Sequence, residues 1–349
     1  GGIGIRYRIK DGEPLITAVL ENTPAEKAGV RKDDRLTHVD GVILMGLSRI
    51  EISDRLRGPT HTRVGLTIQR EGLLNPLKVS MERAHIFPTT VFRSAKDGIV
   101  LLKVKSFNQD TARSLASELK KARAALGDGI KGLVIDLRGN PGGLLKQSVK
   151  VSNLLLSQGQ IVSTRGRHTD SIHHYEASGR DLASRLPIIV LIDGKSASAA
   201  EIVAAALQDR DRAVLVGTSS FGKGSVQTVI RLPNEGEITL TWSRLVAPTG
   251  YLLHGLGVLP AICTSGIKDG AQAVIRKVMA NRKKTEETLA AWRKPGLRAE
   301  LGRNRLRTAC PAQRRRDEME ILIARQLIQD QTLFTQALNL TVETHQARN

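Results

Sequence analysis

Short apolar runs separated by turn residues fill the first quarter of the chain. Residues 16–20, 36–39 and 63–69 are rich in Val, Ile, Leu and Thr, and segments that contain Gly, Pro, Asn and Asp divide them. Such runs are typical of half-buried strands, and the dividing residues are typical of turns. The pattern therefore predicts a small β-rich domain with one or two helices over residues 1–83.

Longer β and α segments alternate over residues 84–265. The hydrophobic pattern predicts strands at 99–104, 133–137, 188–192 and 213–216, and helices at 111–125, 144–157 and 199–207. Strands that alternate with helices imply crossover connections and a largely covered sheet. Residues 266–349 are predicted to form a helical C-terminal region, so the fold class expected for the whole chain is α/β (α+β).

The composition narrows the classes of protein that remain. Of the 349 residues, 40% are hydrophobic and 25% are charged, which is enough for a sizeable core. The longest apolar stretch, residues 186–192, contains a proline and is far shorter than the roughly 20 residues of a membrane-spanning helix. The chain is therefore not expected to be an integral membrane protein. With two cysteines, it is also not expected to be a miniprotein whose fold depends on a framework of disulfides.

The net charge raises the question of an anionic partner. It is +19, from 53 basic and 34 acidic residues, and such a balance would suit a nucleic-acid binder. An aromatic fraction of 3% leaves little for base stacking, and the basic residues are scattered. A solvated basic surface is the simpler interpretation, an anionic membrane or cell-wall surface is the alternative, and no specific nucleic acid is expected.

Two serines lie in a turn between a predicted strand and a predicted helix. Residues 193–201 read Asp-Gly-Lys-Ser-Ala-Ser-Ala-Ala-Glu and directly follow the strand predicted at 188–192. Such a turn can expose a serine hydroxyl and place N–H groups of the new helix where they stabilise a developing oxyanion. Ser196 and Ser198 are both candidates for a nucleophile, and helix capping is the alternative role of each.

A lysine between two glycines is the second candidate for chemistry. Lys223 lies between Gly222 and Gly224, shortly after the strand predicted at 213–216. A neutral lysine can take the proton of a serine hydroxyl, and burial lowers a lysine pKa toward the working pH. An exposed turn residue or a phosphate contact is the alternative, although the spacing of a P-loop is absent. Gln227 can hold the amine in place or can be an ordinary strand residue.

Four segments, in chain order, carry a resemblance to a known family. They are residues 1–5 (Gly-Gly-Ile-Gly-Ile), 136–143 (Asp-Leu-Arg-Gly-Asn-Pro-Gly-Gly), 194–201 (Gly-Lys-Ser-Ala-Ser-Ala-Ala-Glu) and 221–227 (Phe-Gly-Lys-Gly-Ser-Val-Gln). Together they resemble the C-terminal processing peptidases, or tail-specific proteases, which are PDZ-bearing serine proteases with a Ser–Lys dyad. The resemblance covers residues 1 to about 263. It implies a PDZ-like domain over 1–83 and a protease core over 84–265, followed by the helical region 266–349.

The resemblance also implies roles for individual residues. Ser198 corresponds to the nucleophile, Lys223 to the general base and Gln227 to the amide that orients the base. The family's spacing of 25 residues between serine and lysine is kept (223 minus 198), which favours Ser198 over the other serine. The implied oxyanion hole consists of the backbone N–H of Ala199 and one from the glycine-rich turn, where we favour Gly143 over its neighbour.

The remaining polar residues of these motifs have simpler interpretations. Asp136 is expected to tie the glycine-rich turn together, and Glu201 to make a favourable contact with the dipole of its helix. No cofactor and no metal is implied, and His173-His174 is more simply a loop pair than a metal site. Asp33 and His61 stand at turn positions where the family usually has glycine.

The PDZ-like domain is expected to recognise the substrate. An extended peptide would add a strand to an exposed sheet edge, and backbone amides would capture its terminal carboxylate. The segment expected to do this is Gly2, Ile3, Gly4 and Ile5, and because the chain begins inside this loop we expect the loop to be incomplete. The implied partners are protein or peptide substrates with apolar C-termini, while a homo-oligomer or an adaptor is left open.

The two cysteines bear on the compartment. Cys263 and Cys310 lie 47 residues apart, one ending the protease region and the other in the helical region. They are either two free buried cysteines or one disulfide that pins the helical region to the core, which would require an oxidising compartment. The resemblance favours an exported protein of the bacterial periplasm or cell envelope, whose signal segment is not in this chain.

These observations predict a serine endopeptidase of the C-terminal processing type. Such an enzyme would hydrolyse peptide bonds through an acyl-enzyme on Ser198. The first alternative is a catalytically silent PDZ scaffold or peptide-binding protein, against which the complete Ser–Lys–Gln set argues. The second alternative is a binder of nucleic acid or of an anionic surface, which only the net charge supports.

Overall fold

The chain forms two compact units. The computed structural model describes residues 1–267, 269–295, 300–314 and 318–346, and the units are Gly1–Thr89 and Thr90–Asn349. The first boundary therefore falls at Thr89, close to the expected residue 83. The helical region 266–349 is part of the second unit, because apolar side chains such as Trp292, Ile323 and Leu327 are buried in that unit's core.

The first unit is a six-stranded antiparallel sheet with two short helices. The strands follow the order β1-β2-β3-β5-β6, with β4 paired to β3, so β1 lies at one edge. In β5 the side chains of Val64, Leu66 and Ile68 alternate into the core, as expected of a half-buried strand. The elements are β1 (Ile5–Lys10), β2 (Glu13–Val19), α1 (Pro24–Lys27), β3 (Arg35–Val39), β4 (Val42–Ile43), α2 (Arg49–Leu56), β5 (Arg63–Gln69) and β6 (Leu77–Glu82).

Two turns of this unit keep a backbone conformation that glycine favours. Asp33 has a φ of 69° and His61 a φ of 68°, both in the left-handed region. Aspartate and histidine are among the residues other than glycine that adopt it most often. The two positions where the family usually has glycine are therefore left-handed turn positions here as well.

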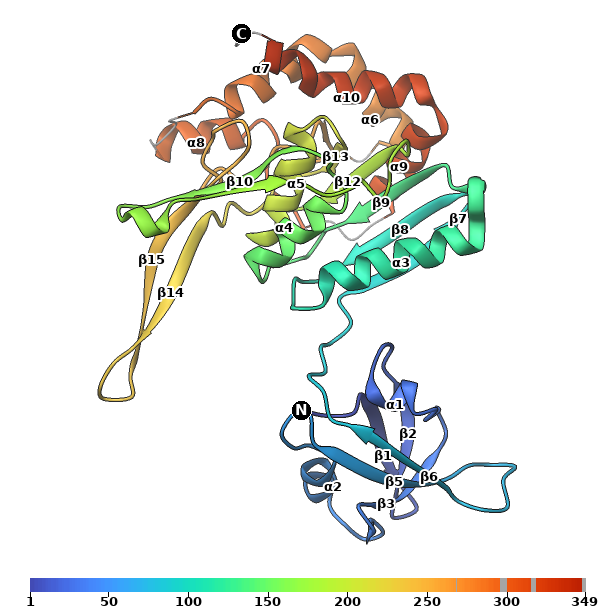
Figure 1. Cartoon of the computed structure of the whole chain (residues 1–349). Helices are drawn as coiled ribbons and strands as arrows, with labels where there is room; N and C mark the ends of the chain where they lie inside the picture. Colours follow the sequence, from blue (N-terminus) through green and yellow to red (C-terminus); the bar gives the residue numbers. More distant parts are fainter. Residues whose placement is uncertain (268, 296–299, 315–317, 347–349) are drawn as a thin grey trace. The chain divides into compact units, whose positions relative to one another are not determined.

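The second unit is built on a six-stranded sheet with the order β16-β13-β12-β9-β8-β7 (Figure 1). Neighbouring strands run parallel except β7, which is antiparallel to β8. All residues of β9, β12 and β13 are buried, which explains their continuous apolar runs. The strands are β7 (Val91–Lys96), β8 (Ile99–Val104), β9 (Gly132–Asp136), β12 (Ile188–Ile192), β13 (Val214–Gly217) and β16 (Ile262–Cys263).

Helices cover this sheet. The helix α3 packs on β7 and β8, α5 on β13, and both α9 and α10 contact β13. Figure 1 shows the C-terminal helices, in orange to red, gathered along one border of the unit. No helix in the described ranges is both long and apolar enough to cross a membrane. The helices are α3 (Thr111–Leu126), α4 (Leu145–Asn153), α5 (Ala199–Asp209), α6 (Ala271–Ala280), α7 (Arg282–Trp292), α8 (Glu300–Arg307), α9 (Met319–Gln329) and α10 (Gln331–Gln346).

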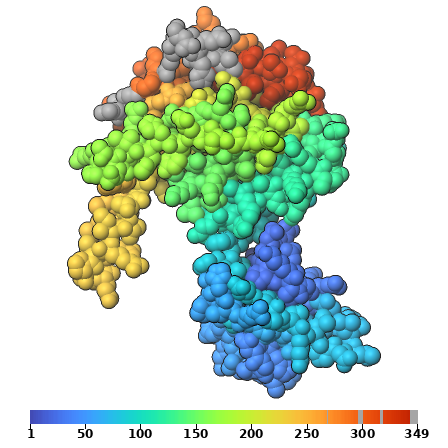
Figure 2. All heavy atoms as spheres, in the orientation of Figure 1, coloured from blue at the N-terminus to red at the C-terminus, as the bar shows by residue number. Residues whose placement is uncertain are grey.

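A second, four-stranded antiparallel sheet was not predicted from the sequence. Its order is β11-β10-β15-β14, and it consists of β10 (Gly159–Arg165), β11 (His173–Ala177), β14 (Ser225–Arg231) and β15 (Glu237–Val246). The hairpin of β14 and β15, yellow in Figure 2, projects from the body of the unit. The helix expected over 144–157 is also shorter. It ends at Asn153, whose Oδ1 accepts hydrogen bonds from the N–H groups of Ser178 and Gly179 after β11.

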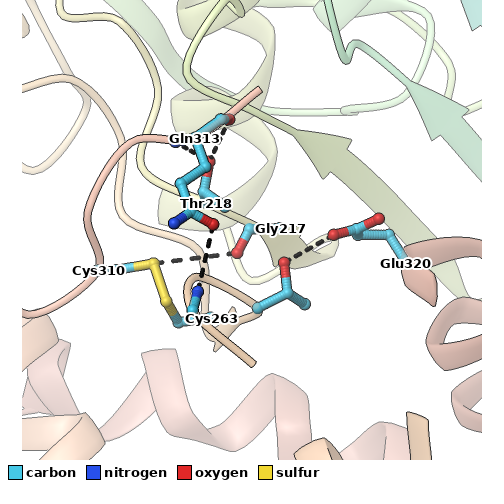
Figure 3. The surroundings of a disulfide bond; sticks show 8 residues. Gly217, Thr218, Cys263, Cys310, Gln313 and Glu320 are labelled. Atoms are coloured by element: carbon cyan, nitrogen blue, oxygen red, sulfur yellow. Dashed lines mark hydrogen bonds between the residues drawn. A yellow bond between two sulfur atoms is a disulfide. The ribbon is translucent and has the colours of Figure 1, made fainter. Parts of the chain in front are cut away.

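A disulfide joins Cys263 of β16 to Cys310, three residues after α8 (Figure 3). It corresponds to the second of the two interpretations drawn from the sequence. The sulfur of Cys310 also lies 3.9 Å from the carbonyl oxygen of Gly217, at the end of β13. The bond thus connects the C-terminal region directly to the edge of the central sheet.

Removal of this disulfide should lower the stability of the second unit. The bond closes a loop of 47 residues, and a loop of that length restricts the unfolded chain by about 4 kcal/mol in the loop-entropy model. We expect the Cys263→Ser/Cys310→Ser variant to lose about that much free energy of unfolding, measured by urea denaturation. Coincident unfolding curves for the oxidised chain and this variant would contradict the expectation.

Candidate active site

Three neighbouring parallel strands end at one edge of the central sheet. The strands β9, β12 and β13 are adjacent, and each is followed by one of the segments singled out in the sequence. Because the carboxyl ends of parallel strands share an edge, the loops that follow them meet there. Residues 137–143, 193–198 and 218–224 therefore converge on one place, although up to about 80 residues separate them in the chain.

Ser198 is held in a rare backbone conformation at this edge. It is the residue before α5, it is partly exposed, and its φ and ψ are 55° and −113°. A positive φ in a residue other than glycine is uncommon and costs of order 1–3 kcal/mol, and such residues cluster at functional sites. The turn presents the serine at the N-terminus of α5, next to the N–H of Ala199, which has no hydrogen-bond acceptor among the described residues.

Ser196, the other candidate, is committed to structure. It is fully buried, and its Oγ accepts a hydrogen bond from the N–H of Asp193 at 2.9 Å. The same hydroxyl donates to the carbonyl oxygen of Leu137, also at 2.9 Å. It therefore ties the loop after β9 to the loop after β12. The geometry separates the two serines, since only Ser198 is accessible.

Glu201 joins the serine turn to the lysine loop. Its carboxylate is fully buried, and Oε2 accepts hydrogen bonds from the N–H of Ser198 at 2.7 Å and the N–H of Lys223 at 2.9 Å. Its Oε1 accepts from the Ser220 hydroxyl at 2.5 Å and from the N–H of Gly222 at 2.6 Å. The sequence analysis expected only a helix-dipole contact here. In the structure this carboxylate is the point that two motifs share.

The electrostatics of Glu201 are those of a buried acid surrounded by donors. Burial raises the pKa of its carboxyl, and the four donated hydrogen bonds act in the opposite direction. Arg307 of α8 lies beside it and donates to the carbonyl oxygens of Ser220, at 2.9 Å, and Leu256. Burial lowers the pKa of Arg307, while the charge of Glu201 raises it. Arg307 was missed in the sequence analysis, because it lies outside every recognised motif.

The positions of Lys223 and Gln227 correspond to the alternatives that the sequence analysis gave them, an exposed turn residue and an ordinary strand residue. The side chain of Lys223 is exposed, not buried, and so is that of Gln227 in β14. Among the described residues, no hydrogen bond joins Lys223 to Ser198 or to Gln227. The lysine lies two residues before the β14–β15 hairpin, which projects from the body of the unit (Figure 2), and its side chain is exposed although both neighbouring glycines are buried. The structure brings the backbones of the two motifs together but leaves the lysine side chain in solvent.

The glycine-rich turn lies directly against Ser198. A Cβ on Gly142, whose φ is +100°, would come within 2.8 Å of the Ser198 Cβ, so only glycine fits there. The N–H of Gly142 donates to Asn140 Oδ1 at 2.8 Å and is therefore occupied. Within the described ranges, the N–H groups of Gly143 and Ala199 have no hydrogen-bond acceptor. These two N–H groups are the pair that the sequence analysis favoured for an oxyanion hole.

An ionic network anchors the start of this turn. Arg138 donates to both oxygens of Asp136, at 2.9 and 3.0 Å, and to Glu320 of α9 at 3.1 Å. Burial is the largest single effect on the pKa of the Asp136 carboxyl, and it raises this pKa. The hydrogen bonds and charge of Arg138, together with the charge of Lys103, outweigh burial and hold the pKa below its usual value. Glu320 in turn accepts from the Thr264 hydroxyl at 2.7 Å. Asp136 thus ties the turn together, as expected.

The segment 308–314 braces two of the three loops (Figure 3). The carbonyl oxygen of Gln313 accepts a hydrogen bond from the N–H of Gly194, in the serine turn, at 2.7 Å. It also accepts from the hydroxyl of Thr218, after β13, at 2.9 Å. The disulfide at Cys310 holds this segment against the sheet. The C-terminal region therefore contacts the loops that carry the candidate serine and lysine.

The first unit has a separate cavity at the segment expected to bind peptide. Gly2, Ile3, Gly4 and Ile5 line it, together with residues of α2 such as Leu56, and its volume is about 440 Å³. The Ile3 side chain is 3% exposed and packs in the core, so only its backbone is available to a ligand. The cavity lies beside β1, the edge strand of the sheet.

No metal site accompanies these groups in the part of the chain that the structure describes. No cluster of three or more His, Cys, Asp or Glu side chains is placed to hold an ion there. His173 and His174 lie at the start of β11 and are exposed, where the sequence analysis expected a loop.

Comparisons with known proteins agree with these features. Residues 98–264 match Peptidase family S41, and residues 15–70 match the PDZ domain family. A carboxy-terminal-processing protease of Bartonella bacilliformis is 41% identical over 263 residues, which are 75% of this chain and 61% of that protein. A probable CtpA-like serine protease of Staphylococcus aureus is 32% identical over 263 residues, 75% of this chain and 52% of that protein.

The chain thus spans between half and two thirds of the length of these relatives. A solved structure, the photosystem II D1 C-terminal processing protease, is 27% identical, with 74% of this chain and 71% of that chain covered and a TM-score of 0.46. The helices α6–α10 lie after the last residue matched by the peptidase family. The two family matches and the 41% identical relative show that the chain belongs to the C-terminal processing peptidases of Peptidase family S41 and carries a PDZ domain.

Proposed function

We propose that this protein is a serine endopeptidase in which Ser198 is the nucleophile and Lys223 the general base. One observation carries the proposal. The buried Glu201 carboxylate accepts hydrogen bonds from the backbone N–H of Ser198 and of Lys223, at 2.7 and 2.9 Å. The backbones of a serine and a lysine that lie 25 residues apart in the chain are thereby hydrogen-bonded to the same carboxylate.

The reaction would proceed through an acyl-enzyme. The Ser198 oxygen attacks the carbonyl carbon of the peptide bond, and Lys223 takes the hydroxyl proton. The oxyanion accepts hydrogen bonds from the N–H groups of Ala199 and Gly143, and the N-terminus of α5 adds a favourable dipole. The lysine then gives its proton to the leaving amine, and a water activated by the same lysine releases the new carboxylic acid.

The lysine side chain has to turn toward the serine for this reaction. In the structure it is exposed, and the rotation has to take place within the side chain itself, because the backbone of residues 253–255 packs closely against the glycines on either side. Gln227, four residues further on, would then accept a hydrogen bond from the amine and hold it near Ser198. Exclusion of water by the bound substrate would favour the neutral form of the amine.

The PDZ domain would bind the C-terminal tail of the substrate. The edge strand β1 offers unpaired backbone groups to an extended peptide, and the cavity formed by residues 1–5 lies beside it. A tail with apolar side chains suits this site, because Ile5, Leu56 and Ile86 are among the residues that line the cavity. The disulfide supports an oxidising compartment such as the bacterial periplasm or cell envelope.

A fluorophosphonate probe tests the proposal. Such a probe phosphonylates only a serine that is activated as a nucleophile, whose oxygen displaces fluoride from phosphorus, so we expect it to label the folded chain. Proteolytic mapping should place the label on Ser198, and the probe should not react with the unfolded chain. Absence of labelling under conditions where the chain also fails to cleave an unfolded protein with an apolar C-terminal tail would refute the proposal.

The activity is expected to rise with pH. The lysine must lose a proton to act as a base, and the Glu201 network requires an ionised carboxylate that accepts four hydrogen bonds. Burial raises the pKa of Glu201, so its protonation sets in at a higher pH than for an ordinary glutamate as the pH falls. Both effects reduce kcat/KM on the acid side. An optimum near about pH 5 in a profile of kcat/KM would contradict the neutral-lysine mechanism.

A further inference from the structure

A basic cavity lies next to the lysine loop, outside the residues that the proposed reaction uses. It has a volume of about 850 Å³ and is formed by β10, β15 and segments from the C-terminal region. We call it the arginine cavity, after four of its lining residues, and no Asp or Glu is among the described residues that line it. The side chains that matter here are Arg165, Arg167, Arg244, Arg303, His168 and Trp242.

The positive charges of this cavity are arranged unfavourably for the protein alone. Arg165 of β10 and Arg244 of β15 are direct cross-strand partners. Like charges in that position repel each other and destabilise the ladder. In the described part of the chain, neither of them nor Arg167 forms an ion pair with a carboxylate. His168 does lie 3.5 Å from the exposed carboxylate of Asp170, outside the lining.

The cavity is contiguous with the loop of the proposed base. Arg244 is the ladder partner of Ser225, two residues after Lys223, and the N–H of Leu245 donates to the carbonyl oxygen of Gly224 at 2.8 Å. The positive potential extends to this loop. The pKa of His254, whose backbone touches Gly224, is lowered by burial and then by the charges of Arg244 and Arg303.

We propose that the arginine cavity binds the carboxylate side chains of an acidic segment in the polypeptide substrate, beside the bond that is cut. Several guanidinium groups in one concave site concentrate the positive potential, and each can bind a carboxylate through two hydrogen bonds. Trp242 and His168, with ring centroids 5.8 Å apart and ring planes tilted by 31°, supply an aromatic surface for the backbone and apolar atoms of a peptide. The inference rests on the proposed peptidase function, since it specifies which substrates that site prefers.

A polypeptide fits the position of the cavity better than a free phosphate does. The strand β14 pairs with β15, which lines the cavity, and as the edge strand of its sheet it can pair with an extended chain. A chain that crosses Ser198 and Lys223 would therefore continue past Arg244. Because arginine side chains bind phosphate groups as well as carboxylates, the test also includes inorganic phosphate and tripolyphosphate as ligands.

Trp242 makes the binding measurable without hydrolysis. The protein has two tryptophans, of which Trp242 is 41% exposed in the cavity and Trp292 is 1% exposed in the core. We would titrate the full chain carrying Ser198→Ala with two peptides of equal length, one containing four consecutive Glu and the other four Gln, both with amidated C-termini. The Glu peptide should change the tryptophan fluorescence and bind about 10-fold or more tightly than the Gln peptide. The signal should be absent in a Trp242→Phe variant.

Matched charge variants identify the cavity as the site. The double variant Arg165→Gln/Arg244→Gln should bind the Glu peptide about 10-fold or more weakly. The control Arg180→Gln/Arg276→Gln removes the same charge from exposed positions outside the cavity and should bind it with unchanged affinity. Equal affinity for the two peptides would overturn the proposal. So would binding of tripolyphosphate or phosphate without binding of the Glu peptide. Because binding is read in the Ser198→Ala protein, a failure of the peptidase proposal appears separately, as absent probe labelling of the unaltered chain.

Discussion

The Ser198→Ala variant should lose hydrolysis of peptide bonds by about 10⁴-fold or more while it remains folded. The substitution removes the attacking oxygen and leaves the Glu201 hydrogen bond to the backbone N–H of residue 198 in place. Alanine is smaller than serine, so the partly exposed turn can accept it. The measurement is the initial rate of cleavage of an unfolded protein with an apolar C-terminal tail, alongside a thermal melt.

Ser196→Ala is the matched control, two residues away in the same turn. Its buried hydroxyl accepts from the N–H of Asp193 and donates to the carbonyl oxygen of Leu137. Its loss removes two buried hydrogen bonds and should cost about 1–3 kcal/mol of stability. The folded variant should still cleave the substrate. Cleavage by Ser198→Ala at the unaltered rate, or an equal loss of rate in both folded variants, would show that Ser198 is not the nucleophile.

Glu201→Gln should lower kcat by about 10²- to 10³-fold. The amide has the shape of the carboxylate but places N–H donors where an oxygen accepted two hydrogen bonds. In one orientation it faces the N–H groups of Ser198 and Lys223, and in the other it faces Ser220 and Gly222. In the first orientation two N–H donors lose their acceptor inside the protein, which costs about 1–3 kcal/mol for each. In the second the N–H of Gly222 loses its acceptor, while the Ser220 hydroxyl can turn and accept a hydrogen bond from the amide. The serine turn and the lysine loop then lose their common attachment.

The variant Glu320→Gln is the control that distinguishes the loss of loop positioning in Glu201→Gln from a general loss of protein stability. Glu320 is also fully buried and also accepts hydrogen bonds, from Arg138 and from Thr264, but among the described residues no hydrogen bond joins it to the serine turn or the lysine loop. Its variant should lose a similar amount of stability in urea denaturation and much less of kcat. If both glutamate variants lowered kcat by the same factor, Glu201 would act only through the fold and not as a positioning residue.

The core of the fold and the place of the site follow from local sequence patterns. The predicted strands 99–104 and 188–192 coincide with β8 (Ile99–Val104) and β12 (Ile188–Ile192). A strand buried on both faces of a parallel sheet leaves a continuous apolar run, which is visible without any knowledge of its neighbours. The sequence analysis placed the polar motifs directly after such runs. That the loops after β9, β12 and β13 converge at one edge of the sheet follows from the parallel order of these strands in the structure.

The second sheet could not be predicted from the local pattern of hydrophobic residues. The strands β14 and β15 lie in a projecting hairpin with mostly exposed side chains, so burial does not impose a clear hydrophobic alternation on them. Their partner β10 is joined to β15 across about 80 residues of chain. Lys223 lies two residues before this hairpin, and its side chain is likewise exposed. Nothing in the residues around Lys223 distinguishes a buried lysine from an exposed one.

The sequence alone was enough to indicate the family, the two candidate residues for chemistry and the order of the central elements, because these depend on neighbouring residues and on short motifs. The role of Glu201 depended on tertiary structure, since the groups it binds are backbone N–H donors, which any residue except proline supplies. The same holds for Arg307, which binds carbonyl oxygens, and for the arginine cavity, whose charges come from segments far apart in the chain. Interactions that use the backbone or join distant segments have no local sequence pattern, and only the folded chain reveals them.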